Sequence, residues 1–214
     1  QAFRTIARAG YAVFCFDQTG FGRRIEEVER FYIDYPDWSL LGKMLRDTQA
    51  ALDVMHELPY IDTDKIYIVG YGLGAMIGLH LAAIDERPAG YALVSPPPPF
   101  RLDTDVARTG GFQRWAQLHM LLPNLGLFTE APERIPYDVD GLLAAMAPRP
   151  VLVHTGRLNR NSPPDLLERA VTEAQSAFAR TGAEKQLEHA IPAAYDHFDT
   201  TQQNIVVDWL KRIK

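Results

Sequence analysis

Short apolar runs alternate with helical patterns along almost the whole chain, and this alternation limits the folds that it can adopt. The apolar runs predict strands over residues 11–17, 65–70, 90–95, 150–156 and 186–191. Helical spacing, or a run of small residues, predicts helices over residues 1–9, 40–57, 75–83, 164–181 and 200–213. Strands that alternate with helices indicate an α/β fold, with a mainly parallel sheet and helices on both faces. In such a sheet, ligands bind at the carboxyl ends of the strands.

Composition narrows the classes of function. The chain has 214 residues, a net charge of −5 and no long apolar stretch, which is typical of a soluble domain without a transmembrane segment. Lys and Arg form no basic stripe, so we expect no nucleic-acid partner. The only cysteine, Cys15, excludes a disulfide framework and a cysteine-based zinc site, and the histidines form no metal-binding pair. We therefore expect neither a metal nor a cofactor, and the compartment stays open.

The chain is interpreted as a single domain, residues 1–214, with one irregular stretch. Residues 101–143 break the alternation of strands and helices and contain several prolines, so we expect an insertion with short helices. Such an insertion is interpreted as lid-like. Within it, Trp115 and His119 are expected to serve in packing.

The loop after the second predicted strand, Gly70 to Ala75, allows two interpretations. It matches the glycine pattern of a dinucleotide-binding turn, because it follows a strand and opens a helix. That pattern normally opens its domain, and an acidic residue ends the next strand. Here a strand and a helix precede it, and the next strand ends in Ser95 and prolines. The alternative is a nucleophile elbow, G-x-S-x-G, in which Gly72 stands where the serine should be.

The second interpretation agrees with a family resemblance. The stretch DKIYIVGYGLGAMIGLHLAAIDERPAGYALVSP is similar to the elbow region of α/β-hydrolases. More narrowly, the chain resembles the bacterial dienelactone-hydrolase and acetyl-xylan-esterase-like branch. The supporting stretches are GYAVFCFDQTGFG, TGGFQRWAQLHMLLPNLG, IPYDVDGLLAAMAPRPVLV and the closing WL. The resemblance runs from about residue 10 to the C-terminus.

The resemblance implies a site made of four positions. In that family the catalytic triad follows the chain order Ser, Asp or Glu, His. Carried over, the nucleophile position is Gly72, the acid position is Asn159 and the base is His197. The backbone N–H of Leu73 would be one oxyanion donor. Glycine carries no nucleophile, and asparagine carries no charge to stabilise an imidazolium, so two of the three triad positions depart from the pattern.

Other candidate residues are expected to have lesser roles in the site. Asp196 and Asp199 flank His197 and are considered as substitute acids. Cys15 and His154 lie on predicted strands and are expected in the core. His80 lies on the helix after the elbow and is expected to pack there.

Two function classes follow, and whether the chain is an enzyme stays open between them. The first is a hydrolase-fold pseudoenzyme that acts as a binding or assembly subunit. The second is an active esterase or lactonase with an unconventional nucleophile. A small ester or a carbohydrate is the expected ligand of either. A nucleotide-binding α/β domain is a third, weaker alternative, based on the glycine pattern at Gly70.

The resemblance also makes predictions about the backbone. The elbow should hold Gly72 at a positive φ. In the family's strand order, a further strand lies between the strand at 11–17 and the elbow strand, so the domain looks incomplete at its N-terminus. We therefore expect upstream residues that complete the sheet, a partner chain that donates the strand, or a rearranged sheet in which 11–17 pairs directly with 65–70.

Overall fold

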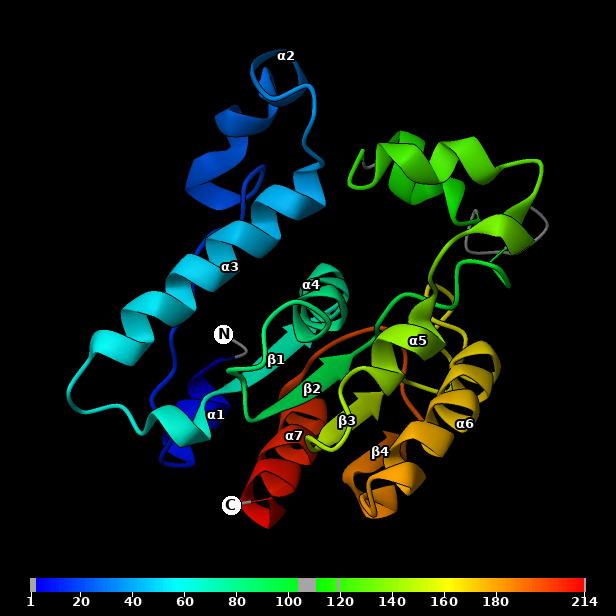
Figure 1. Cartoon of the computed structure of the whole chain (residues 1–214). Helices are drawn as coiled ribbons and strands as arrows, with labels where there is room; N and C mark the ends of the chain where they lie inside the picture. The colour runs from blue at the N-terminus through cyan, green and yellow to red at the C-terminus, as the bar shows by residue number, and fades with distance from the viewer. Residues whose placement is uncertain (1–2, 104–110, 119, 214) are drawn as a thin grey trace.

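A parallel sheet of four strands forms the centre of the protein, which is described here from a computed structural model covering residues 3–103, 111–118 and 120–213. The strands are β1, Tyr67–Tyr71; β2, Gly90–Val94; β3, Val151–His154; and β4, Leu187–Ala190. They lie in the order β1-β2-β3-β4, and each is parallel to its neighbours (Figure 1). In register, Gly70 lies opposite Leu93, and Leu93 lies opposite Val153. The predicted α/β fold with a parallel sheet is confirmed.

Helices cover both faces of this sheet. One face carries α4, Leu73–Ala82; α5, Val139–Ala144; and α6, Pro164–Arg180. The other face carries α1, Phe3–Arg8, and α7, Thr200–Arg212. Along β2, Tyr91 and Leu93 pack with the first group of helices, whereas Ala92 and Val94 pack with the second. The continuous apolar run of β2 is therefore explained by burial on both sides.

The longest helix, α3, Leu40–Glu57, has the bounds that its apolar spacing predicts. Ser39 precedes it, and the Ser39 side chain accepts a hydrogen bond from the Gly42 N–H at 3.0 Å. The buried residues of α3 form one stripe, which includes Leu41 and Met44 and packs near α4. The apolar spacing in the sequence and the packing of α3 in the structure therefore agree.

The remaining elements are short. Before α3 come η1, Gly22–Val28, and α2, Phe31–Asp34; η2, Thr63–Lys65, and η6, Glu184–Gln186, precede β1 and β4. The insertion at 101–143 contains η3, Arg114–Leu118; η4, Pro123–Phe128; and η5, Pro132–Arg134; its last residues overlap α5. These short helices were expected.

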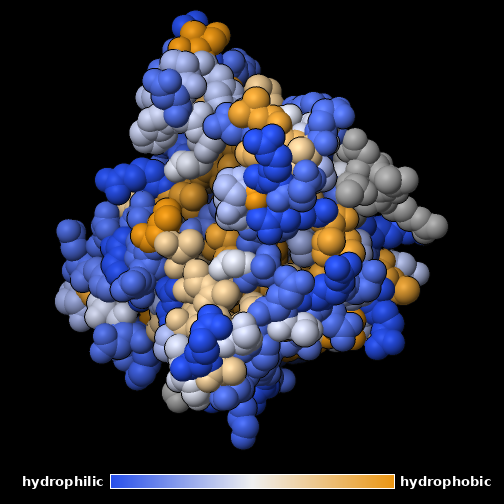
Figure 2. Space-filling view, turned by 45° about the vertical axis from the view of Figure 1, so that its right-hand side comes forward, coloured by the Kyte–Doolittle hydropathy of each residue, from blue (hydrophilic) through white to orange (hydrophobic). Residues whose placement is uncertain are grey.

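The insertion packs over the outer side of α4. Its residues Phe112, Ala116 and Leu125 form one apolar cluster with Met76 of α4. Trp115 packs against the same cluster, in line with its predicted role, whereas His119 and residues 104–110 lie outside the described residues. Figure 2 shows a largely hydrophilic face on which apolar side chains gather in a hollow. The lid function of the insertion stays a prediction.

The expected strand at 11–17 is wrong. These residues are extended but pair with none of the four strands, so β1 forms one edge of the sheet. Phe14 is 49% exposed and Phe16 is 38% exposed, whereas Tyr11 and Val13 are partly buried against the apolar cluster that α1 and α7 form with the sheet. Cys15 is exposed as well, which corrects its expected place in the core. The physical reason is the absence of a neighbouring strand, because an apolar run becomes a buried strand only when a second strand pairs with it.

No helix among the described residues is both long enough and apolar enough to cross a bilayer.

Candidate active site

A sharp turn at Gly72 connects β1 to α4. Gly72 has φ +55° and ψ −110°, which confirms the positive φ predicted for the elbow. A Cβ atom added to Gly72 would meet nothing within 4 Å, so the tip of the turn is open. A Cβ atom on Gly70 would lie 2.2 Å from the carbonyl oxygen of Gly74. The close approach of helix and strand therefore requires a glycine at position 70, and the backbone direction favours one at 72.

Leu73, the expected oxyanion donor, is the first residue of α4. Backbone N–H groups in the first turn of a helix have no intrahelical acceptor. They also lie at the positive end of the helix dipole. The start of α4 thus has backbone N–H groups without intrahelical acceptors, and a role for the Leu73 N–H as an oxyanion donor stays a prediction.

The side chain of Asn159, at the predicted acid position, makes hydrogen bonds within its own loop. The side chain is buried, and its Oδ1 accepts hydrogen bonds from the N–H groups of Asn161 at 2.9 Å and Ser162 at 3.1 Å. Its Nδ2 donates to the hydroxyl of Ser95, 3.0 Å away, at the end of β2. Asn159 therefore holds a turn together and ties β3 to β2, which is a structural use of the amide.

His197 lies in the loop after β4, where the family pattern expects the base. Its ring is 45% exposed, and its Nε2 lies 3.1 Å from Oδ2 of Asp199. Asp199 also caps α7, and the hydrogen bond from the Gln202 N–H lowers its pKa, with His197 lowering it further. Among the described contacts, none joins His197 to Gly72 or to Asn159. All three positions follow the carboxyl ends of strands, but no described contact connects them as a triad.

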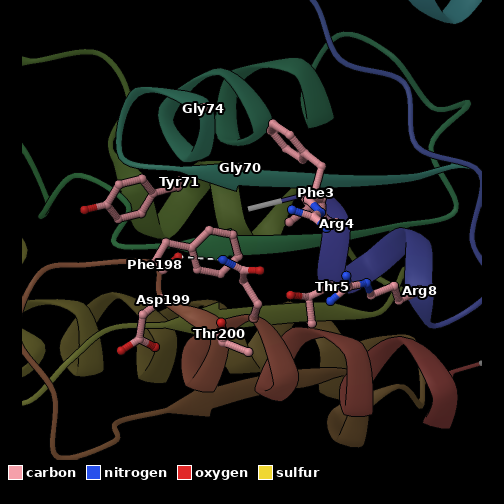
Figure 3. Close-up of a pocket in the computed structure, with 12 residues that line it drawn as sticks. Phe3, Arg4, Thr5, Arg8, Gly70, Tyr71, Gly74, Phe198, Asp199 and Thr200 are labelled. Carbon is pink, nitrogen blue, oxygen red and sulfur yellow. Dashed lines mark hydrogen bonds between the residues drawn. The ribbon is translucent and has the colours of Figure 1, made fainter. Parts of the chain in front are cut away.

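Tyr71, which precedes Gly72, holds the loop that carries His197. Its hydroxyl donates to Oδ1 of Asp196 at 3.0 Å, and its ring stacks on Phe198 with centroids 5.8 Å apart. Figure 3 shows this stack beside the start of α7. Partial burial, together with the bond to Asp196, raises the pKa of Tyr71 to about 12. Asp196 and Phe198 are the two neighbours of His197 in the chain, so Tyr71 fixes both flanks of that residue.

Three features at the carboxyl ends of the strands were not predicted from the sequence. Asn161 donates its Nδ2 to Oδ2 of Asp196 at 3.0 Å, which links the loops after β3 and β4. Ser95 has φ +50°, an uncommon value for a residue with a side chain. With Tyr71, these residues surround the elbow, but they are far apart in the sequence and follow no known spacing. No sequence signal marks them beyond their place after predicted strands.

Two further histidines, His154 and His80, are buried, as their predicted places in the core require. His154 is 2% exposed, and burial lowers its pKa. His80 is buried, with Nδ1 2.8 Å from the carbonyl oxygen of Met76 and Nε2 3.2 Å from the hydroxyl of Tyr137. Both side chains therefore pack in the interior of the protein. In the part of the chain that the structure describes, no group of His, Cys, Asp or Glu side chains is arranged to hold a metal ion.

Known proteins resemble the chain in sequence and in fold. A curated relative, YtaP of Bacillus subtilis (strain 168), carries a hydrolase name and is 26% identical over 198 residues, which are 89% of this chain and 60% of YtaP. A promiscuous CE15 esterase from a marine bacterial metagenome has a TM-score of 0.73 at 15% identity, over 91% of this chain and 54% of that one. A CE15 glucuronoyl esterase from Caldicellulosiruptor kristjansonii has a TM-score of 0.69 at 21% identity, over 85% and 54%.

These likenesses concern the fold, and the chain spans less than two thirds of the length of each relative named above. The narrower branch expected from the sequence stays a prediction. A family model described as "Alpha/beta hydrolase family" matches residues 2–208. Since that match covers almost the whole sequence, the chain belongs to the alpha/beta hydrolase family.

Proposed function

We propose that this α/β-hydrolase relative of esterases is catalytically inactive as a serine hydrolase and serves as a binding or assembly subunit. One observation carries the proposal: the elbow has its backbone geometry, yet Gly72 at its tip has no nucleophile. Without the serine no acyl-enzyme can form. A triad lacking its members retains only about 10³ to 10⁴ of rate acceleration over water, from binding and oxyanion stabilisation.

The contacts around the acid and base positions support the same conclusion. Asn159 is neutral, and both ends of its amide already have partners. His197 lies 3.1 Å from Asp199 and is 45% exposed, so its ring is not held over Gly72 by any described contact. A general base must lie within hydrogen-bond reach of the proton that it removes. Among the contacts of the described residues, none joins the His197 ring to a hydroxyl.

The ligand that suits this site is a small ester, including an ester of a carbohydrate. The free N–H groups at the start of α4 can donate to a carbonyl oxygen, and the missing side chain at Gly72 leaves room beside them. The esterase neighbours in the structure comparison, two of them named as CE15 esterases, support an ester as the ligand class. Binding without turnover is the expected behaviour.

Two measurements test the proposal. The first is turnover of p-nitrophenyl acetate together with labelling by a fluorophosphonate probe, and we expect neither above the level of the heat-denatured chain. The second is binding of methyl glucuronate, followed by the chemical shifts of the Leu73 and Gly74 amides, which we expect to move. Burst kinetics, or covalent labelling of any serine, would contradict the inactive assignment. Unchanged amide shifts at saturating ligand would contradict the ligand class.

Ser95 favours one second candidate, an esterase with an unconventional nucleophile. Its backbone is strained at φ +50°, it lies beside the elbow strand, and Asn159 donates to its hydroxyl. Strained residues of this kind gather at functional sites. If fluorophosphonate labelling is found, its loss in Ser95→Ala and the loss of turnover in His197→Ala would identify this candidate. Retention of labelling in Ser95→Ala would exclude it.

A further inference from the structure

Two aromatic side chains lie next to each other on the surface, just before the start of α3. Tyr35 is 50% exposed and Trp38 is 47% exposed, and their ring centroids are 5.9 Å apart with the ring planes tilted by 44°. Figure 1 shows α2, which leads into this segment, well away from the sheet. We call Tyr35 and Trp38 the aromatic patch. Exposed apolar side chains that touch one another mark binding surfaces, whereas isolated ones are common and carry no such meaning.

Backbone hydrogen bonds and two further rings hold the aromatic patch in place. The Tyr35 N–H donates to the Phe31 carbonyl at 2.8 Å, and the Trp38 N–H donates to the Tyr35 carbonyl at 3.2 Å. The Phe31 ring is buried, and its centroid lies 5.6 Å from that of Tyr35. Tyr32 packs edge-on against Phe31, and its hydroxyl accepts a hydrogen bond from the Leu40 N–H at 3.0 Å. Rings held in this way lose little conformational entropy when a ligand binds.

The area of the aromatic patch is too small for a stable protein–protein interface. An aromatic side chain buries about 150–250 Å² when it is fully covered, so two half-exposed rings offer about 200 Å² together. Ile33 of α2, which is 70% exposed, adds one more side chain. A stable interface buries about 800 Å² on each partner. The patch therefore fits a ligand that is only a few rings long better than it fits a second copy of this chain.

The charges around the aromatic patch are mainly acidic. Asp34 precedes Tyr35 and Asp37 precedes Trp38 in the chain, and both aspartates are exposed. Arg30, which lies 3.5 Å from Asp34, is the one basic residue among residues 26–37, whereas five residues of that range are acidic. This balance repels a polyanion such as a chain of uronates. Hydroxyl groups, in contrast, can donate hydrogen bonds to the two carboxylates.

The spacing of the two rings favours a sugar chain over a cation. Aromatic cages bind a cation over their ring faces. The Tyr35 and Trp38 rings instead contact each other and leave no space for a cation between them. A pyranose with equatorial hydroxyls has two flat faces of C–H groups and a polar rim. One unit of a β-linked chain of such sugars is about as long as the distance between the two centroids, so neighbouring units can lie on neighbouring rings.

We propose that the aromatic patch binds a neutral, β-linked sugar chain, with one unit stacked on Tyr35 and the next on Trp38. Asp34 and Asp37 accept hydrogen bonds from the hydroxyl groups at the rims of these units. The patch is a second binding surface, and this inference does not require the elbow to bind an ester. The neutral chain expected here also differs from the uronate ester that probes the elbow, so the two surfaces can be tested separately.

Titration with cellohexaose, a neutral β-linked glucose chain, tests the proposal. Binding is followed by calorimetry and by the NMR signal of the Trp38 indole N–H, which we expect to shift. We expect Trp38→Ala and Tyr35→Ala each to weaken the affinity by about tenfold or more. Tyr35→Phe retains the ring, and Tyr60→Ala removes an exposed tyrosine beyond the other end of α3, so both should stay within about twofold of the original chain. Hexagalacturonate, an anionic chain of the same length, should bind about tenfold more weakly than cellohexaose.

Four outcomes would overturn the proposal. An unchanged Trp38 signal up to the solubility limit of cellohexaose would mean that the aromatic patch binds no sugar chain. Equal affinity in Trp38→Ala and in the original chain would place the sugar at another surface. Equal or tighter binding of hexagalacturonate, or of choline, would identify a site for charged ligands. A Trp38 signal that shifts with the concentration of the protein alone would identify a second copy as the occupant.

Two controls separate these outcomes from other failures. Circular dichroism shows whether each variant is folded, and if Trp38→Ala is not, Tyr35→Ala and the comparison of the two sugar chains still decide the question. The amides of Leu73 and Gly74 are followed with methyl glucuronate in Trp38→Ala and in the original chain, and we expect the same shifts in both. A failure of the ester site at the elbow is thereby distinguished from a failure of the aromatic patch.

Discussion

The elbow at Gly72 and the loop at Asn159 both lack the side chain that the family's triad pattern places there, yet they differ in what holds their shape. At the elbow the backbone alone keeps the shape, because Gly70 allows close packing against Gly74 and Gly72 adopts a positive φ. In the loop a side chain keeps the shape, since Asn159 makes three hydrogen bonds. A turn held by backbone packing needs no side chain at its tip to keep its shape, whereas the shape of the Asn159 loop depends on the Asn159 side chain.

The largest effect is expected from Gly70→Ala. The added Cβ would lie 2.2 Å from the Gly74 carbonyl oxygen, and backbone on both sides leaves no flexible atom to move. We expect the free energy of unfolding to fall by about 3 kcal/mol. Urea denaturation followed by circular dichroism measures this change in the free energy of unfolding.

Gly74→Ala is the matched control for that variant. A Cβ at Gly74 meets nothing within 4 Å, and the residue lies in the first turn of α4. Alanine in a helix is favoured over glycine, so we expect a gain of about 0.5 kcal/mol. Equal losses in both variants would show that the elbow is not packed as described.

The second-largest loss of stability is expected from Asn159→Ala, which tests the loop that is held by a side chain. The change removes three hydrogen bonds and leaves the N–H groups of Asn161 and Ser162 without their acceptor. We expect a loss of about 2 kcal/mol, measured by the same denaturation experiment. Asn161→Ala, at an exposed position, should cost less than about 0.5 kcal/mol. A neutral Asn159→Ala would mean that this loop, like the elbow, is held by its backbone.

The local patterns of the sequence were enough to predict most elements but not the strand at 11–17. Helix α3 matches its predicted bounds because its apolar stripe and its Ser39 cap are local features. The run at 11–17 has an equally strong apolar pattern, but a strand depends on a partner elsewhere, and the described residues supply none. The prediction that Cys15 lies in the core was wrong for the same reason.

The candidate site, like the fold, combines a feature set by neighbouring residues with contacts between residues far apart in the sequence. The elbow and its positive φ follow from five consecutive residues, so the turn at Gly72 could be predicted. The contacts of Tyr71 with Asp196 and of Asn159 with Ser95 join residues separated by 125 and 64 positions. A single sequence carries no spacing rule for such pairs. The turn at Gly72 could therefore be predicted, whereas the contacts around Gly72 and Asn159 could not.

Gly72→Ser asks whether the elbow regains chemistry when the side chain returns. The serine has space, because nothing lies within 4 Å of the added Cβ, but it must adopt φ +55°. We expect a loss of about 1 kcal/mol from this strain. We expect no esterase activity, since no described contact places His197 near position 72. Gly72→Ala controls for the strain, and hydrolysis of p-nitrophenyl acetate by the serine variant alone would contradict the expectation.

The smallest effect is expected from Tyr71→Phe, which keeps the stack on Phe198 and removes the hydroxyl bond to Asp196. Tyr71 is 41% exposed, so the loss should stay below about 1 kcal/mol. Its pKa in the folded protein, about 12, is above the ordinary value of 10.0, so folding favours the neutral phenol. The stability that the hydroxyl adds is therefore complete below pH 10 and is lost as the pH rises toward 12.

Denaturation of the original chain and of Tyr71→Phe at pH 8, 9, 10 and 11 measures this difference, which should shrink over the last two steps. Tyr60→Phe, at a residue 75% exposed, is the control, and its free energy of unfolding at pH 8 should lie within about 0.5 kcal/mol of that of the original chain. Amide exchange of residues 195–198 at pH 8 should quicken in Tyr71→Phe alone, because the bond to Asp196 restrains that loop. If both tyrosine variants behave alike, the loop that carries His197 is held by the chain around it, and its position at the elbow does not depend on Tyr71.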